Sequence, residues 1–437
     1  MSEIVDQNRK IAFSKLFGER KRELPRGIVS VCSAHPLVVE AALRRASDEG
    51  SVALIEATCN QVNQEGGYTG MTPAAFRRFI ERIAEKVGFR PENIIFGGDH
   101  LGPNPWRKLA AEEAMSRAAK MVEAYVEAGF EKLHLDTSMG CAGEAAALPD
   151  ELTAERAARL AKAAEDAARR AGRRPPVYII GTEVPPPGGA THAIEELEVT
   201  RSEAAAKTLA VHAAAFDEAA VSEAMDRVIG VVVQPGVEFG NANVVLYKPE
   251  KARELASRLN RMPGLLFEAH STDYQTAEGL SSLVDDGFAI LKVGPGLTFA
   301  LREAFYALDA IRAILLPERT AGNLPAEMEA IMVGQPQHWS GHYHGSSDEM
   351  RLQRHFSYSD RIRYYWPESE ALRAVESLFA ELPDTIPETL ISQHLARVYP
   401  DVVAGRVPPR ARDLCLAAID SALTPYSVAT ATTRQLR

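Results

Sequence analysis

The stretch Asn93–Trp106, NIIFGGDHLGPNPW, decides the fold of this chain. Its apolar start, Ile94–Phe96, is too short and too uniformly apolar for a surface helix, so it predicts a buried strand. The pair Gly97-Gly98 is expected to let the backbone turn tightly before the next two residues. Those residues are Asp99 and His100. A strand that ends in a carboxylate and an imidazole predicts chemistry at the rim of a sheet.

Eight such runs, each followed by a helix-compatible stretch, organise the chain up to residue 315. Strands are expected at Ile28–Ala34, Val52–Thr58, Asn93–Asp99, Lys132–Ser138, Val177–Glu183, Val228–Gln234, Leu265–Ser271 and Ala289–Gly294. Parallel strands need crossover helices, and closure removes both exposed edges. The pattern therefore predicts an α/β fold, a (β/α)8 TIM barrel. A doubly wound open sheet is the alternative, although no dinucleotide glycine fingerprint opens the first unit.

In a barrel, the carboxyl ends of all strands meet at one face, so polar residues that are distant in sequence converge there. The side chains and glycines that we expect to contact a substrate or its phosphate are Glu56, Gln64, Gln234, Ser271, Lys292, Gly294 and Gly296. The last two flank the start of the final barrel helix, where free backbone N–H groups favour an anion. An ordinary glycine-containing turn is the alternative interpretation.

The same face offers ligands for a divalent cation. The candidate ligands are His100, His270, Glu183 and Glu238. Zinc is the first expectation for a shell rich in nitrogen, and manganese or magnesium for one rich in oxygen. No linear metal motif such as HExxH or CxxC occurs, so this prediction depends on convergence in three dimensions. We expect His134 to be a buried, hydrogen-bonded barrel residue instead.

Several long segments carry a resemblance to a known family. They are GIVSVCSAHPLVVEAAL, LIEATCNQVNQEGGYTGMTP, FGGDHLGPNPW, HLDTSMGC, GTEVPPPGG, VVQPGVEFG, FEAHSTDYQT, LKVGPGLTFALREA and SDRIRYYW. In these segments the chain resembles the GatZ/KbaZ family of D-tagatose-1,6-bisphosphate aldolase subunits. The resemblance implies a class II aldolase-like barrel in D-tagatose 6-phosphate metabolism, with a phosphorylated ketohexose as substrate. Members carry three activity labels: aldolase subunit, tagatose 6-phosphate kinase and D-tagatose 6-phosphate 4-epimerase.

The family is similar in turn to class II aldolases, and this likeness implies roles for individual residues. Asp99 corresponds to the catalytic acid/base, and His100 and His270 to metal ligands. Asp136 and Glu183 are further candidate catalytic carboxylates. Where those aldolases place another metal-binding histidine after strand six, this chain has Gln234 and Glu238.

The residues that each reaction requires allow the three activity labels to be ranked. No phosphate-binding loop or kinase catalytic loop appears, so the kinase label is the weakest. Inverting C4 of a 2-ketohexose 6-phosphate cannot proceed by simple proton removal, because C4–H is not adjacent to the C2 carbonyl. Cleavage and re-formation of C3–C4, with a metal and an acid/base, is the predicted route. The alternative is a non-catalytic subunit that stabilises a separate catalytic aldolase subunit of the GatY/KbaY type.

Composition fits a cytoplasmic metabolic protein. A homo-oligomer is a separate expectation. The formal charge is −10 over 437 residues, so nucleic acid and anionic membranes are not expected partners. Four scattered cysteines predict reduced thiols rather than a disulfide framework. We expect residues 1–316 to form the barrel with an N-terminal lead-in, and 317–437 to form a helical extension. In that extension, Arg361 and Arg363 either clamp a phosphate or brace the extension against the barrel.

Overall fold

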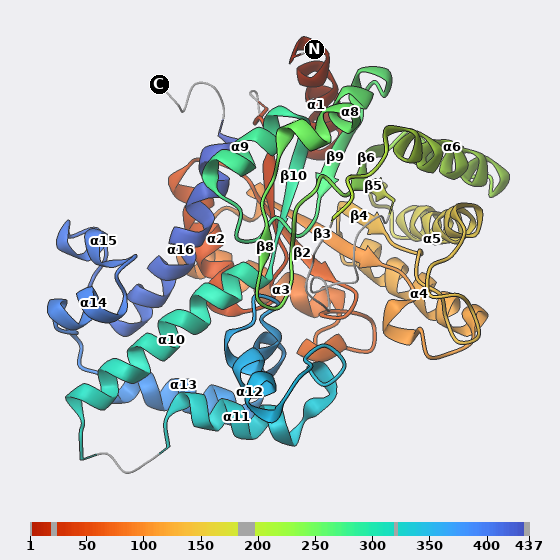
Figure 1. The fold of residues 1–437 in the computed structure, drawn as a ribbon. Coiled ribbons are helices and arrows are strands. Elements are labelled where there is room, and N and C mark those ends of the chain that lie inside the picture. The colour runs from red at the N-terminus through yellow and green to blue at the C-terminus, as the bar shows by residue number, and fades with distance from the viewer. Residues whose placement is uncertain (1, 19–23, 182–196, 319–321, 432–437) are drawn as a thin grey trace.

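The structure is a computed structural model that describes residues 2–18, 24–181, 197–318 and 322–431. Eight parallel strands close into a barrel with the order β1, β10, β9, β6, β5, β4, β3, β2 (Figure 1). These strands are β1 (Ile28–Val31), β2 (Ala53–Thr58), β3 (Ile94–Leu101), β4 (Lys132–Leu135), β5 (Val177–Ile180), β6 (Val228–Val233), β9 (Leu266–Ala269) and β10 (Phe288–Val293). The closed barrel confirms the predicted TIM fold and rules out the open sheet.

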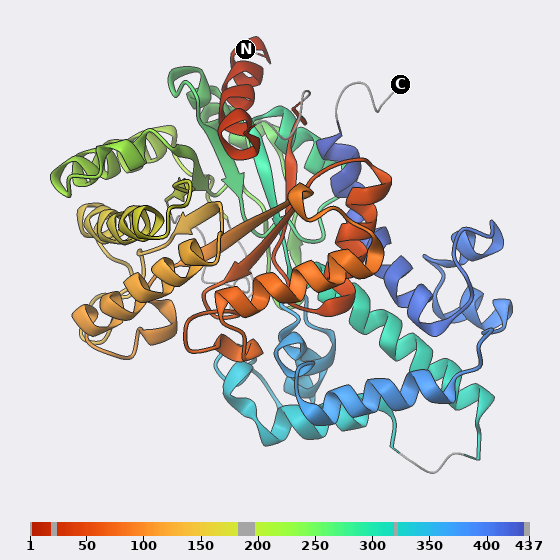
Figure 2. The same cartoon turned by 180° about the vertical axis from the view of Figure 1, so that it is seen from behind.

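Helices follow the strands and cover the outside of the barrel (Figure 2). They are α2 (Pro36–Asp48), α3 (Pro73–Val87), α4 (Ala111–Glu127), α5 (Asp150–Arg170), α6 (Ser202–Glu218), α7 (Ser222–Met225), α8 (Pro249–Arg258), α9 (Ala277–Asp285) and α10 (Pro295–Leu315). α3 shows how the sequence sets these bounds: the Thr72 side chain accepts the N–H of Ala75, and Gly88 ends the helix at a φ of 72°. A short antiparallel pair, β7 (Glu238–Phe239) and β8 (Val244–Val245), follows β6.

The glycine pair of β3 has a different role from the one predicted. The strand continues through Gly97 and Gly98 to Leu101, and both glycines pair with β2. A Cβ on Gly97 would lie 2.6 Å from Cγ of Glu56, and one on Gly98 would lie 2.6 Å from Cδ1 of Leu101. The glycines therefore provide space for neighbouring side chains and do not turn the chain.

An N-terminal helix, α1 (Ser2–Phe17), closes one end of the barrel (Figure 1). Its side chains Phe13 and Phe17 are buried in the same cluster as Ile95, Ile179 and other residues inside the barrel. The helix packs against β6 and β9. This end of the barrel is a sealed apolar core, so chemistry is confined to the other end.

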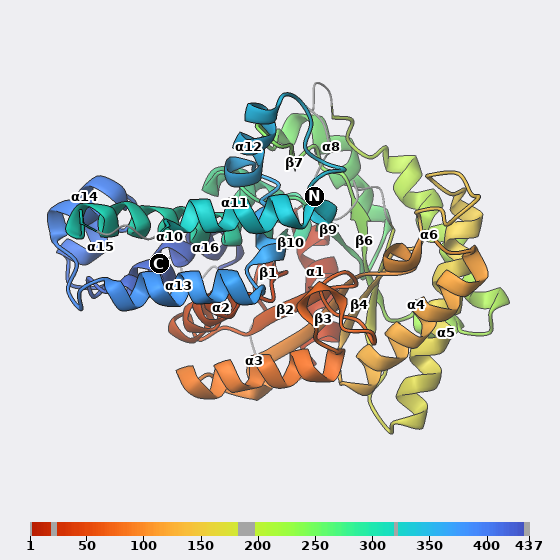
Figure 3. The same cartoon turned by 90° about the horizontal axis from the view of Figure 1, so that it is seen from below.

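The expected extension consists of helices and connecting loops in its described part. Its elements are α11 (Leu324–Gly334), α12 (Ser347–Phe356), the 3-10 turn η6 (Arg361–Tyr365), α13 (Ser369–Glu381), α14 (Glu388–His394), α15 (Tyr399–Val403) and α16 (Ala411–Thr430). α11 and α12 lie at the end of the barrel opposite α1 (Figures 1 and 3). Among the described helices, none has both the length and the apolar character needed to cross a membrane.

The last helix returns to the barrel wall. α16 packs against α2, α9, α10 and strand β1. Two arginine contacts hold it to α2: Arg412 binds Glu40, and Nε of Arg45 lies 2.7 Å from Oδ1 of Asp420. α16 thus completes the helical ring between α9 and α2, while α10 leads outward to the extension (Figure 1).

Candidate active site

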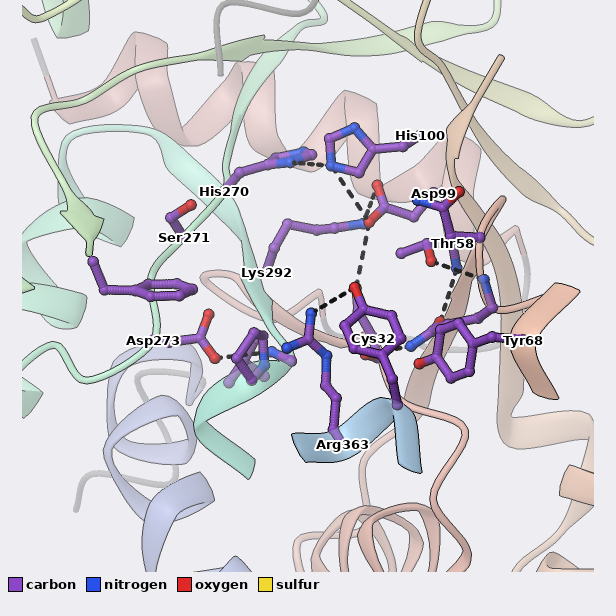
Figure 4. Close-up of a pocket in the computed structure, with 17 residues that line it drawn as sticks. Cys32, Thr58, Tyr68, Asp99, His100, His270, Ser271, Asp273, Lys292 and Arg363 are labelled. Carbon is purple, nitrogen blue, oxygen red and sulfur yellow. Dashed lines mark hydrogen bonds and ion pairs between the residues drawn. The ribbon is translucent and has the colours of Figure 1, made fainter. Parts of the chain in front are cut away.

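An open pocket of about 670 Å³ lies at the carboxyl ends of the barrel strands. The ends of β3, β9 and β10 form one side of it, and η6 from the extension forms part of the other. Figure 4 shows His100 and His270 at one edge of this pocket. Arg363 and Tyr68 lie at the opposite edge, with Lys292 between the two. The extension therefore contributes to the same cavity as the barrel.

Four buried side chains bring possible metal ligands together: Asp99, His100, His134 and His270. One ligand atom from each lies within 4.8 Å of the others. Nδ1 of His270 and Nε2 of His100 are 3.2 Å apart. Ligands bound to zinc tetrahedrally at ~2.0–2.1 Å are roughly 3.3 Å from one another. The donor set and its spacing therefore fit a divalent metal ion.

Carboxylates lie behind the rings of His100 and His270. Nδ1 of His100 is 2.7 Å from Oδ2 of Asp136, and Nε2 of His270 is 2.9 Å from Oε1 of Glu268. Histidines that bind metals commonly donate their second ring N–H to such a carboxylate, which fixes the tautomer. The opposite nitrogens of these two rings then keep lone pairs that face each other. Asp136, a predicted catalytic residue, is therefore placed to orient His100.

His134 forms hydrogen bonds with its neighbours in the cluster. The backbone N–H of His100 donates to Nδ1 of His134 at 3.2 Å. Nδ1 of His134 also lies 3.1 Å from Oδ1 of Asp99, and Nε2 lies 3.1 Å from the carbonyl oxygen of Gly181. The predicted buried, hydrogen-bonded state of His134 agrees with this geometry.

Two residues of the pocket have a strained backbone. His100 has a φ of 48° and Ser271 a φ of 52°. Residues other than glycine rarely adopt such angles, and strain of this kind concentrates at functional sites. The left-handed conformation comes at the ends of β3 and β9, where it turns each side chain toward the pocket.

A buried network of charges supports the pocket floor. Nζ of Lys132 is 2.7 Å from carboxylate oxygens of both Glu56 and Glu268. Nζ of Lys292 lies 2.7 Å from Oε2 of Glu56 and 2.8 Å from Oδ1 of Asp99. Buried charges are tolerated only when they are paired, and here each one has a partner of opposite charge. The network therefore fixes Asp99 and Lys292 in position.

The same charges set the protonation of the pocket. Burial alone would raise the pKa of Asp99, but Lys292 and His100 hold it well below its usual range. Burial opposes the charge on Lys292, yet Asp99 and its other neighbours raise the pKa of Lys292 well above its usual value. Burial lowers the pKa of His270 to about 3. At neutral pH the pocket thus holds an ionised aspartate, a protonated lysine and a neutral imidazole.

The carboxylate of Asp273 already occupies the N-terminus of α10. Oδ1 of Asp273 accepts the backbone N–H groups of Gly294 at 3.0 Å and Gly296 at 2.7 Å. Burial raises the pKa of Asp273 to about 6. The two N–H groups that we expected to bind a phosphate are therefore engaged by a side chain. A Cβ on Gly296 would lie 3.0 Å from that same oxygen.

Of the two arginines singled out in the extension, one reaches the pocket. Arg361 donates to the carbonyl oxygen of His338 and braces the extension. Arg363 lines the pocket, and its guanidinium donates to the carbonyl oxygen of Asp360 at 3.0 Å and to the Tyr364 hydroxyl at 3.1 Å. Within the described ranges no carboxylate forms an ion pair with Arg363, so its charge is available to a ligand.

The structure brings six of the predicted site residues to the pocket: Asp99, His100, His270, Ser271, Lys292 and Gly294. Others require correction. Glu56 has no exposed surface and binds the two buried lysines instead. The Gln64 amide donates to the carbonyl oxygen of Arg117, away from the pocket. Oε1 of Gln234 accepts the N–H groups of the turn that follows β6.

The predicted ligand Glu238 also lies outside the metal cluster. It is fully buried in β7, and its Oε1 accepts the N–H of Phe239 at 3.0 Å. Burial raises the pKa of Glu238 to about 7, which disfavours the ionised form that a metal requires. Glu183, expected both as a ligand and as a catalytic carboxylate, lies outside the described residues.

Sequence reasoning missed several residues of the pocket and its floor: Cys32, Gln61, Tyr68, Lys132, Asp273 and Tyr364. Asp273 follows the strand end of β9 by a few positions, so extending the inventory of that loop would have found it. Tyr364 belongs to the quoted segment SDRIRYYW, but nothing local shows that this segment reaches the barrel mouth.

Several proteins that are similar to this chain have names that state an activity. A D-tagatose 6-phosphate 4-epimerase from Agrobacterium fabrum is 54% identical over 416 residues, which are 95% of this chain and 97% of that protein. The crystal structure of a probable tagatose 6 phosphate kinase from Sinorhizobium meliloti 1021 matches with a TM-score of 0.86 and 58% identity, covering 92% of this chain and 100% of that one. The YdjI aldolase from Escherichia coli K12 matches at 12% identity with a TM-score of 0.41, too weak a likeness to support an argument.

The family model described as D-tagatose-1,6-bisphosphate aldolase subunit GatZ/KbaZ-like matches residues 13–431. This range takes in the barrel strands, the pocket, and the described extension as far as its last helix. The resemblance noted in the sequence is therefore confirmed over nearly the whole chain, and the protein belongs to the GatZ/KbaZ-like family.

Proposed function

We propose that this protein is a D-tagatose 6-phosphate 4-epimerase that interconverts D-tagatose 6-phosphate and D-fructose 6-phosphate. One observation carries the proposal: an ionised Asp99 lies beside the facing ring nitrogens of His100 and His270 in a single pocket. This equipment suits cleavage of a carbon–carbon bond next to a hydroxyl group. The name of the Agrobacterium fabrum relative supports the same reaction.

The reaction begins at the C4 hydroxyl group. Asp99 takes its proton, C3–C4 breaks, and the electron pair of that bond passes to the C2 carbonyl to give an enediolate. The aldehyde fragment rotates, the enediolate attacks its other face to re-form C3–C4, and a proton is returned to the new C4 alkoxide, which gives the opposite configuration at C4. Lys292, protonated and 2.8 Å from Asp99, keeps this carboxylate ionised and oriented between turnovers.

A divalent metal fits the cluster, and zinc is the ion that its nitrogen-rich donors favour over manganese or magnesium. His100 and His270 would hold it, with Asp136 and Glu268 fixing their tautomers. When bound, such an ion polarises the ketone and stabilises the enediolate.

The substrate phosphate requires positive charge in a chain whose net charge is −10. Arg363 supplies it from the edge of the pocket opposite the histidines (Figure 4). A guanidinium can bind a phosphate through two N–H groups at once. Gly294 and Gly296 would serve this phosphate only if Asp273 moved away from them.

A second candidate function is that of a stabilising, non-catalytic subunit. The family description as an aldolase subunit favours it, with a catalytic partner of the GatY/KbaY type. The kinase function is the least supported, because the sequence has no nucleotide-binding loop. All four cysteines are free, which supports a reducing compartment such as the cytoplasm. A homo-oligomer stays a prediction.

The test is to incubate the purified protein, without any partner, with D-tagatose 6-phosphate and each of several divalent metals. We expect D-fructose 6-phosphate to form, and the D99N variant to be slower by about 10²–10⁴-fold. Bound metal is measured in the same samples. If no product forms with any metal, and the protein instead raises the activity of a co-purified aldolase subunit, the subunit function replaces the epimerase.

A further inference from the structure

Inversion at C4 makes a stereochemical demand that one acid/base does not meet. After cleavage, the aldehyde must present its other face to the enediolate, so its oxygen moves to the other side of C4. When C3–C4 forms again, the new alkoxide takes its proton at that second position. If the proposed function is correct, the pocket therefore needs a second proton-transfer group, on the side away from Asp99.

The extension brings a phenol into the pocket. Tyr364 belongs to η6 and lines the pocket beside Arg363, whose Nη2 lies 3.1 Å from the Tyr364 hydroxyl oxygen. Figure 4 shows Arg363 rising from the edge of the pocket that faces the barrel residues Asp99 and His100. Tyr364 is only 9% exposed and lines this cavity.

The ring of Tyr364 is held rigidly. Its ring packs edge-on against Tyr68, with a centroid distance of 4.6 Å, and stacks on His338 at 5.0 Å and an angle of 7°. The guanidinium carbons of Arg361 and Arg363 lie 4.9 and 4.5 Å from its ring centre. Catalytic groups work best when packing fixes their position in this way.

Its electrostatic surroundings are unusual among the tyrosines of this chain. Burial raises the pKa of Tyr364, but the charges of Arg363 and Arg361 outweigh that effect and lower it overall. Other buried tyrosines, such as Tyr68, have a raised pKa. A phenol between two guanidinium groups can give up its proton and remain stable as a phenolate.

Other ionisable groups around the pocket are already committed. Asp273 accepts the two N–H groups at the start of α10. Lys292 is paired with Glu56 and Asp99. Burial raises the pKa of Cys32 well above its usual value, so its thiol is a weak acid.

We propose that Tyr364 is the second catalytic acid/base, transferring the proton of the C4 oxygen on the side of the pocket opposite Asp99. In one direction Asp99 takes the C4 hydroxyl proton and the Tyr364 phenol donates its own to the new alkoxide. In the other direction the Tyr364 phenolate takes the proton, and Asp99 passes a proton that it has gained from solvent to the new alkoxide. Between turnovers both groups return to their starting protonation states by proton exchange with solvent. Arg361 and Arg363 act as positioning residues that stabilise the phenolate.

This assignment predicts an asymmetry that distinguishes the two residues. Cleavage of one epimer depends on Asp99, and cleavage of the other depends on Tyr364. The test measures release of glyceraldehyde 3-phosphate from each epimer, using a coupled dehydrogenase and the full-length, metal-loaded protein. We expect Tyr364→Phe to slow epimerisation about 10²–10⁴-fold in both directions but to slow cleavage of only one epimer. D99N should slow cleavage of the other.

Tyr365→Phe is the matched control, because the Tyr365 hydroxyl donates to the carbonyl oxygen of Gln335, outside the pocket. Metal content and thermal unfolding of all variants show whether each is folded. Equal loss of cleavage for both epimers, or epimerisation by Tyr364→Phe within about threefold of wild type, would overturn the assignment. A wild-type protein that neither interconverts nor cleaves the two sugars overturns the proposed function itself, a result visible before any variant is made.

Discussion

At the scale of single residues, the pocket depends on side chains that never meet the substrate. Glu56 is enclosed by Lys132 and Lys292, and it has room only because Gly97 beside it has no side chain. Glu268 binds Lys132 with one oxygen and His270 with the other. A buried carboxylate of this kind is costly unless it is paired, and here Lys132 pairs with it while it orients the ring of His270.

The contact between Asp136 and His100 gives a prediction about metal affinity. Asp136→Asn removes the charge that fixes the His100 tautomer, and the loss of such a support typically costs 10–100-fold in metal affinity. We expect a weakening of about that size in a zinc titration against a competing chelator. Asp166→Asn, which changes an aspartate paired with Arg169 on the outside of the barrel, is the control. Equal affinity in both variants would show that Asp136 has no part in metal binding.

Single residues also show what a sequence can and cannot reveal about a site. Asp99, His100 and His270 could be predicted because each lies at or next to the end of a predicted strand, and strand ends converge in a barrel. Gln64 and Gln234 follow strands too, yet local backbone groups capture their amides. Which polar side chain faces the cavity depends on turn geometry and on side-chain contacts across the barrel. Neither can be predicted from a single sequence segment.

At the scale of elements, α16 is held against α2 by a buried carboxylate. Nη1 of Arg412 lies 2.9 Å from Oε1 of Glu40, and Arg44 of α2 binds the same oxygen. Burial raises the pKa of Glu40, but the two arginines lower it overall. Glu40 lies where the first barrel helix, α2, meets α16. A substitution of Glu40 therefore tests how much this contact contributes to stability.

The stabilisation that Glu40 gives to the contact between α2 and α16 should decrease in acid. Because the folded pKa of Glu40 lies below its unfolded value, its stabilising effect is fully present above the usual glutamate pKa of about 4.3. The effect is lost as the pH falls through the folded pKa. We expect Glu40→Gln to lower the free energy of unfolding by about 1 kcal/mol near neutral pH, with the difference shrinking below about pH 4. A difference that stayed constant from neutral pH down to about pH 3, in urea unfolding, would contradict this.

The starts of the strands could be read from the sequence to within one residue, but several ends could not: the strand expected at Ile28–Ala34 ends at Val31, and the one expected at Lys132–Ser138 ends at Leu135. The packing of the elements could not be read either. Pro73 and Gly88 delimit α3 because proline fits a first turn and glycine tolerates the left-handed ending. An amphipathic pattern such as that of α16 shows only that one face is buried. It does not name the helices, α2 and α9, that bury it.

At the scale of the whole molecule, stability and chemistry are assigned to opposite ends of the barrel. α1 seals one end with apolar side chains, and η6 reaches over the other with charged and aromatic ones. Changes at the α1 end should therefore alter the free energy of unfolding without altering the metal site.

Phe13 tests that separation. It has no exposed surface and packs 5.6 Å from the ring of Phe17 within the barrel core. Phe13→Ala should lower the free energy of unfolding by about 3–5 kcal/mol, the usual cost of such a cavity. Ile11→Ala, at a position 39% exposed on the same helix, should change it by less than about 0.5 kcal/mol. Denaturant titrations of both variants, with metal content as a second measurement, check the prediction. Loss of metal from folded Phe13→Ala would show that the two ends are coupled.

The position of α16 between α9 and α2 has a consequence for biosynthesis. The first strand, β1, is covered by a helix that is synthesised after all eight barrel strands. A nascent chain can assemble its strands but keeps an apolar surface exposed until α16 has been made. Chains that stop before Ala411 would keep that surface exposed, and chaperones and proteases recognise such surfaces. Synthesis of α16 is thus a condition for covering the barrel, and cellular quality control can detect its absence.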